Sequence, residues 1–343
     1  MNHFFLPRRV CPASIGLRVG LVMVMLTGTL VPARAETCKT SSDMDDASRS
    51  AIVSGAQRYF DLAASGDVAT LRQNSVPAAA SDFSAIEAVV KDHHTEIAGS
   101  HGTARPPFLL EAEGGTSAQA EFFCGVFDRR GQTSDSAVFR FDGLPPGKYA
   151  VVILDAAASK PPTTVSFVLQ QQGTDWKVRA LSIAPTQAAG HATEWFVSRA
   201  RDYKTKGQLH NAWLYYLQAR ILISPLPFMS TAASDKLYDE SQPLLPADFP
   251  SGGRSADLVA GGATYKLTAI FPQAVGDDLD LIVKYESSDV TDTSHAYQSN
   301  VAVIKAVIAK FPELRGAFAA VVARAVEPGG RDYGTLLAMK DVK

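Results

Sequence analysis

The densest group of candidate metal ligands or proton-transfer groups in this 343-residue sequence is Asp92-His93-His94-Thr95-Glu96. Neutral imidazole and carboxylate groups bind zinc, and histidine exchanges protons near neutral pH. On a helix, however, His93 and His94 point about 100° apart and cannot both face one ion. We therefore interpret the cluster as a solvated helix end and expect no metal site.

Five aspartates surround a predicted hairpin and the loop that follows it: Asp277, Asp278, Asp280, Asp289 and Asp292. Calcium prefers several oxygen ligands from one such stretch, but the Asp-x-Asp-x-Asp-Gly spacing of an EF-hand is absent. Turn chemistry accounts for Asp277 and Asp278, and we expect Asp280 to lie on a solvated strand face. The sequence therefore predicts no calcium site and no cofactor.

Motifs for other common chemistries are also absent. There is no Gly-x-Ser-x-Gly turn for a nucleophilic serine and no Gly-x-x-x-x-Gly-Lys-Ser/Thr loop for nucleotide phosphates. The 33 basic and 35 acidic residues nearly cancel and form no basic stripe, which argues against a nucleic-acid partner. The absence of these motifs does not exclude enzymatic activity, but it favours a non-catalytic role.

The first 35 residues have the three parts of a secretory signal peptide. Basic residues come first, a short apolar run follows over 19–26, and the small-x-small triplet Ala33-Arg34-Ala35 closes the segment. We expect cleavage after Ala35 and a periplasmic or secreted protein. No membrane span remains in the mature chain on this interpretation, because a span needs about 20 apolar residues.

Two cysteines, Cys38 and Cys124, remain after such cleavage. In an oxidising compartment an even number of cysteines favours pairing, so we predict a disulfide that joins the mature N-terminus to a strand. Closing a loop of roughly 85 residues would add about 4–5 kcal/mol to the free energy of unfolding on the chain-entropy model. The alternative is two separate thiols, with Cys124 buried and Cys38 on a flexible tail.

Helical periodicity opens the mature chain, and strand periodicity follows it. Helices are predicted over 48–64, over 68–72 after the break at Gly66-Asp67, and from Ser84 to about 96, where Ser84-x-x-Glu87 forms a capping-box pattern. Six short runs separated by turn residues then predict strands over 108–113, 119–127, 137–141, 149–154, 163–171 and 176–183. Three helices followed by six strands indicate an antiparallel α+β domain, 46–185.

The segment Ile52–Leu71 resembles the opening helices of the nuclear transport factor 2-like superfamily, with an aromatic pair, a small-residue turn, Gly-Asp and then a leucine. Gly173-Thr-Asp-Trp-Lys-Val178 looks like the last strand of that superfamily. The resemblance covers about residues 46–185. It implies a cone-shaped fold, in which a curved antiparallel sheet surrounds a pocket and the helices pack on one side.

The pocket implied by this resemblance is the best candidate binding site, since small ligands bind in concave apolar sites with a few polar groups. Nine residues on the predicted strands are candidates for its lining: Phe108, Glu111, Glu121, Phe122, Arg140, Tyr149, Asp155, Phe167 and Trp176. Which face each one takes stays open, and aromatic core packing gives the same pattern. Enzymes of the superfamily typically place an Asp, His or Tyr in the cone, and no histidine falls on these strands.

The rest of the chain predicts a helical hairpin and a second domain. Residues 190–225 contain two helices around Gly207, which over 192–225 resemble a single tetratricopeptide repeat. Residues 226–255 are rich in Pro, Ser and Gly and predict a linker. Two alternating strands, two helices (the second from Pro312) and a last strand predict a small ββααβ unit over 257–343. The fold class is therefore α+β.

Three functions are compatible with this organisation. We expect an exported, non-catalytic envelope protein that binds a small apolar ligand or a peptide in the cone-shaped domain. One alternative is an isomerase- or hydrolase-like enzyme of the cone superfamily, which would use a buried carboxylate such as Glu111 or Asp155 and would need a perturbed pKa inside a pocket. The other is an adaptor that binds an envelope protein through an exposed apolar groove on 192–225.

Overall fold

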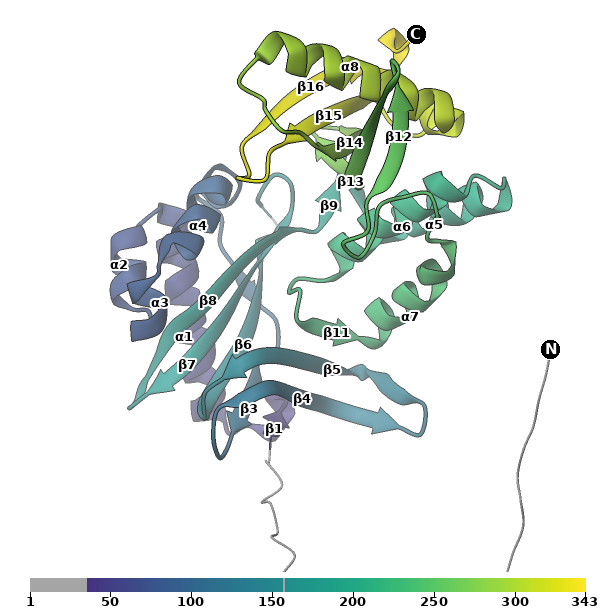
Figure 1. Ribbon diagram of the computed structural model, residues 1–343. Helices are drawn as coiled ribbons and strands as arrows, with labels where there is room; N and C mark the ends of the chain where they lie inside the picture. The colour runs from purple at the N-terminus through teal and green to yellow at the C-terminus, as the bar shows by residue number, and fades with distance from the viewer. Residues whose placement is uncertain (1–35, 157) are drawn as a thin grey trace, which may run out of the picture. The chain divides into compact units, whose positions relative to one another are not determined.

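The computed structural model describes residues 36–156 and 158–343, and the predicted signal peptide, 1–35, lies outside them. Helices and largely antiparallel sheets share the described chain, which confirms the α+β class (Figure 1). In this described part, no helix combines the length and the apolar character that crossing a membrane requires.

Four helices follow the first strand: α1 (Asp46–Ser65), α2 (Val68–Gln73), α3 (Pro77–Ser81) and α4 (Ser84–Ile97). The break predicted at Gly66-Asp67 is confirmed: Gly66 ends α1 with a φ of 73°, and Asp67 caps α2 by accepting from the Thr70 N–H. The helix at Ser84 also begins as predicted. Its capping box does not form, however, because Phe83 occupies the N-cap and no side chain caps the helix.

The largest sheet contains β1 (Glu36–Lys39), β3 (Phe108–Ala112), β6 (Gly147–Ala156), β7 (Thr163–Gln172) and β8 (Asp175–Pro185), hydrogen-bonded in that order and antiparallel. The two-residue strand β2 (Thr103–Ala104) pairs with β6. Helices α1 and α4 cover one face (Figure 1), and Tyr59 and Phe60 of α1 are fully buried against this face. The opposite face is covered too, by the next pair of strands.

Those strands are β4 (Ser117–Asp128) and β5 (Gly131–Leu144), which form a long hairpin. The predicted disulfide is confirmed: Cys38 of β1 and Cys124 of β4 are bonded, with their Cα atoms 5.1 Å apart. The bond therefore joins the large sheet to the hairpin that covers it. A third strand, β11 (Met229–Thr231), pairs with β5 and completes a three-stranded sheet.

The segment predicted as a linker, 226–255, carries β11 and a ten-residue helix, α7 (Ala232–Ser241). Its prolines and glycines do mark turns. Strand β11 between them is not predicted from the sequence, because three residues are too few to show a periodicity.

Two helices, α5 (Thr193–Thr205) and α6 (Leu209–Ile223), form the predicted hairpin around Gly207, whose φ is 74°. The two-residue strands β9 (Gln187–Ala188) and β10 (His191–Ala192) precede them. Helix α6 is buried on most sides and shares one hydrophobic core with the C-terminal sheet. The hairpin and that sheet therefore share one hydrophobic core and are not separate units.

The C-terminal sheet has five strands in sequence order: β12 (Ala256–Ala260), β13 (Ala263–Val275), β14 (Asp278–Glu286), β15 (Ala320–Val326) and β16 (Asp332–Ala338). Only β14 and β15 are parallel, and α8 (Thr293–Lys310) connects them.

The predicted ββααβ order is wrong for this sheet. Pro312 begins only a 3-10 turn, Pro312–Gly316, and not a second α-helix. Val321 and Val322 lie on β15, where burial alternates with the period of a strand.

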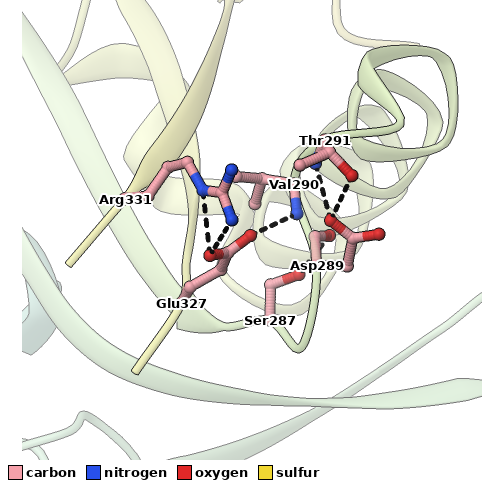
Figure 2. Close-up of polar contacts among 6 residues, drawn as sticks. All are labelled: Ser287, Asp289, Val290, Thr291, Glu327 and Arg331. Atoms are coloured by element: carbon pink, nitrogen blue, oxygen red, sulfur yellow. Dashed lines mark hydrogen bonds and ion pairs between the residues drawn. The ribbon is translucent and has the colours of Figure 1, made fainter. Parts of the chain in front are cut away.

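Side chains fix the loop between β14 and α8 (Figure 2). Glu327 accepts from the Val290 N–H at 2.8 Å and from Arg331 Nε at 3.0 Å. Asp289 accepts from the N–H and the hydroxyl of Thr291, at 2.7 and 2.6 Å. Both acids thus shape the backbone of the loop.

Asp280 departs from its prediction. It is only 3% exposed, and it lies on β14, the central strand of the sheet. Burial raises the pKa of its carboxyl, and the charge of Asp278 adds to the increase.

Candidate functional site

The five aromatic residues among the nine predicted to line a cone pocket divide between two cores on opposite faces of the large sheet. Phe167 and Trp176 pack on the side of α1 and α4, whereas Phe122 and Tyr149 pack under the β4–β5 hairpin. Phe108 joins the second group, with its ring 5.1 Å from that of Phe139. The strands alternate as predicted, but side chains from α1 and from the hairpin fill both faces, and these nine residues meet at no single site.

The carboxylates predicted for the pocket are ion-paired. Asp155 receives two hydrogen bonds from Arg105, at 2.9 and 2.7 Å, and Glu121 receives one from Arg140 at 2.6 Å. Both are surface pairs.

Glu111 lies between Lys148, at 3.3 Å, and Lys39, at 3.5 Å. Burial alone would raise the pKa of Glu111, but the two lysines lower it overall. Glu111 is therefore held as a charged ion-pair partner.

The histidine cluster forms a local contact within α4. His93 Nδ1 lies 2.8 Å from Glu96 Oε2, one helical turn away, in a partly exposed pair. Across residues 36–156 and 158–343, no group of three or more His, Cys, Asp or Glu side chains is arranged to hold a metal ion.

A different concave site lies where the end of α6, strand β11 and helix α7 come together, and we call it the α6–α7 groove. Its volume is about 490 Å³, within the range of small-molecule sites. Helix α6 and the loop after it contribute Leu217, Arg220, Ile221, Ile223, Ser224, Pro225 and Pro227. The other lining residues are Met229, Ser230, Ser234, Asp235 and Tyr238 from β11 and α7, and Ser182 and Ala184 from β8.

Local sequence explains why the chain turns back at this point. Helix α6 ends at Ile223, and the prolines at 225 and 227 cannot continue it. The chain then extends along β5, where Ser230 pairs with Val138. Thr231 starts α7 by accepting from the Ser234 N–H, and Ser234 Oγ accepts in return from the Thr231 N–H.

Arg220 is the cation of the groove. Its guanidinium lies 4.6 Å from the ring centre of Tyr238 and 5.9 Å from that of Trp213. In the chain as the structure describes it, the side chain makes neither an ion pair nor a hydrogen bond. Burial lowers the pKa of Arg220, which means that the charged form is partly desolvated.

Asp235, the carboxylate of the groove, is engaged elsewhere. It accepts a hydrogen bond from Gln132 of β5, and Gln132 Nε2 also lies 3.4 Å from the hydroxyl of Ser230. Burial raises the pKa of Asp235, and the positive charge of Arg140 opposes that increase. The two charged groups of the groove are thus not paired with each other.

The hypothesis favoured from the sequence places the functional site in the cone, whereas the adaptor alternative expects an apolar groove on 192–225, where the α6 residues of this groove lie. The available signal was in α6, where 213–217 is a continuous apolar run that one buried face does not need. Ile221 and Tyr238 at the groove remain 48% and 44% exposed.

Comparison of the chain with family models, with curated proteins and with solved structures gives no match. The resemblance of residues 46–185 to the nuclear transport factor 2-like superfamily, and that of 192–225 to a tetratricopeptide repeat, stay predictions. The α6–α7 groove is therefore the candidate functional site of this chain.

Proposed function

We propose that this is an exported, non-catalytic envelope protein that binds a small amphipathic molecule in the α6–α7 groove. The observation that carries the proposal is the groove itself: a mainly apolar lining of suitable volume, with a few polar groups among it. The proposal keeps the class of function expected from the sequence and moves the site from the cone-shaped domain to the region that follows it.

Export is supported by the disulfide. Bonds such as Cys38–Cys124 persist in oxidising compartments and are rare in the cytosol. Together with the signal-like first 35 residues, this favours a periplasmic or secreted protein that is cleaved after Ala35.

A binding role is favoured over catalysis by the side chains in the groove. The described residues that line it include neither histidine nor cysteine. Its serine nearest a carboxylate in sequence, Ser234, uses its hydroxyl to cap α7, and Asp235 is occupied by Gln132. A nucleophile hydrogen-bonded to a base, which covalent catalysis requires, is not assembled among these lining residues.

A small molecule suits the groove better than a protein partner. A stable protein interface buries about 1,200–2,000 Å² in total, whereas this groove is a local hollow bounded by α6, β11, α7 and β8. An adaptor role for the helical hairpin would need a wider apolar face than its exposed residues Leu209 and Ile221 provide.

The test uses the mature protein purified after expression of the full chain with export. The uncharged fluorophore N-phenyl-1-naphthylamine, which brightens in apolar sites, is titrated into the wild type and two variants. Ile221→Glu places a charge at the groove, and Val259→Glu places one on β12, at an exposed apolar residue outside it.

We expect saturable binding to the wild type and to Val259→Glu, and binding about tenfold weaker or more to Ile221→Glu, because a carboxylate disfavours an apolar ligand. No saturable binding to the wild type, or equal affinities for the two variants, would contradict the proposed function.

A further inference from the structure

We infer that the ligand of the α6–α7 groove carries a negatively charged carboxylate and that Arg220 binds it. The inference rests on the proposed function and adds the chemical class of the ligand: an amphipathic monocarboxylate with an apolar tail.

The guanidinium of Arg220 has no carboxylate partner within the described chain. A guanidinium has five N–H donors in a fixed plane. The rings of Tyr238 and Trp213 lie near that of Arg220, and no hydrogen bond or ion pair within the described chain uses its donors. Other arginines of the described chain bind carboxylates with this edge, as Arg105 binds Asp155 and Arg201 binds Glu240. Arg220 has the same donors and no such partner.

The neighbouring acids, Glu240 and Asp235, already have hydrogen-bond partners other than Arg220. Glu240 of α7 binds Arg201 at 2.7 Å, and Asp235 is hydrogen-bonded by Gln132. The groove therefore has a partly desolvated cation that no carboxylate of the lining offsets, and an anion is the ligand that compensates it.

The single positive charge of the groove and the planar shape of a guanidinium both favour a carboxylate. Arg220 is the only basic residue among the described residues that line the groove, so that one negative charge is matched and a phosphate dianion is not. A carboxylate also fits the planar fork of a guanidinium with two parallel hydrogen bonds. Beyond Arg220, the side chains of Leu217, Ile221 and Ile223 offer an apolar wall for a tail.

The experiment measures displacement of N-phenyl-1-naphthylamine at pH 7.5 by four probes with the same tail, each below its micelle concentration: decanoate, decyl phosphate, 1-decanol and decyltrimethylammonium. The proteins are the wild type, Arg220→Gln and the control Lys266→Gln, which removes the same charge from an exposed residue of β13.

We expect decanoate to bind the wild type at least about tenfold more tightly than 1-decanol, as a charge-assisted hydrogen-bonded pair implies, and more tightly than the other two probes. Arg220→Gln should abolish that preference and leave the affinity for 1-decanol within about twofold, which also shows that the variant is folded. Lys266→Gln should behave as the wild type.

Equal affinities of the wild type for decanoate and 1-decanol, tighter binding of decyl phosphate, or an unchanged decanoate preference in Arg220→Gln would overturn the inference while the groove still binds. Failure of the fluorophore and of all four probes to bind would instead overturn the proposed function.

Discussion

The arginines Arg201 and Arg220 differ in what their surroundings provide. Arg201 donates from Nε and Nη2 to the two oxygens of Glu240, each at 2.7 Å, and Tyr216 donates to the same carboxylate at 2.7 Å. The hydrogen bond from Arg201, opposed by burial and supported by Tyr216, lowers the pKa of Glu240 to about 2. This pair joins α5 to α7 and is structural, whereas Arg220 keeps its donors available.

The Glu240 pair predicts a pH-dependent stability. A depressed pKa in the folded state stabilises the protein above the ordinary carboxyl pKa of 4.5, and the contribution is lost as the pH falls from there toward 2. We expect Glu240→Gln to lower the free energy of unfolding at pH 7 by about 1–2 kcal/mol. Urea unfolding at pH 7 and at about pH 3 should show a smaller gap between variant and wild type in acid.

Asp239→Asn serves as the control for that measurement, since its side chain is exposed on the same helix and makes no ion pair within the described residues. A gap for Glu240→Gln that is the same at both pH values would mean that the carboxylate charge contributes nothing to stability.

At the scale of elements, one buried amide joins α8 to the C-terminal sheet. Asn300 is fully buried, accepts from the Tyr285 hydroxyl at 2.8 Å, and donates to the Tyr333 carbonyl and the Thr335 hydroxyl, each at 3.0 Å. The contact connects α8 to both β14 and β16, on either side of β15.

Replacement of Asn300 by alanine leaves buried polar partners unsatisfied. We expect Asn300→Ala to lower the free energy of unfolding by about 2–3 kcal/mol, measured by urea unfolding monitored by circular dichroism. Gln298→Ala, an exposed change two residues earlier on α8, should have little effect. A similar loss for both variants would show that the cost comes from the helix and not from the buried contact.

The elements also show which parts of the fold the sequence predicts. The break at Gly66-Asp67 and the hairpin at Gly207 were predictable because their signals are local: a left-handed glycine and a capping aspartate. Strand β11 was not, because its three residues are ordered by pairing with β5, about 90 residues earlier. Likewise, Val321 and Val322 form a strand because β14 and β16 flank them.

The set of residues that forms the candidate site could not be predicted, for a related reason. Alternation along β6 and β7 correctly indicates that aromatic residues such as Tyr149 and Phe167 point to the two faces of a sheet. It does not distinguish a face that surrounds a pocket from one that another layer covers. The groove residues Arg220 and Asp235 come together only through the chain reversal after α6, which no local periodicity reports.

At the scale of the described molecule, residues on both sides of the groove belong to the same compact unit. The pairing of β11 with β5 connects the chain after α6 to the disulfide-linked N-terminal part, and α6 shares its core with the C-terminal sheet (Figure 1). The segment predicted as a linker is thus the element that closes the groove.

Fixed elements on each side imply that the groove exists before ligand binding, so that little conformational entropy is lost when a ligand enters. The walls of the groove should therefore move little on binding.

The most direct test of the account is a crystal structure of the mature protein soaked with decanoate. We predict electron density for the ligand in the α6–α7 groove, with its carboxylate within hydrogen-bond distance of the Arg220 guanidinium and its tail along Leu217, Ile221 and Ile223. Density for decanoate inside the sheet of residues 46–185, or a groove that stays empty when decanoate is shown to bind in solution, would contradict it.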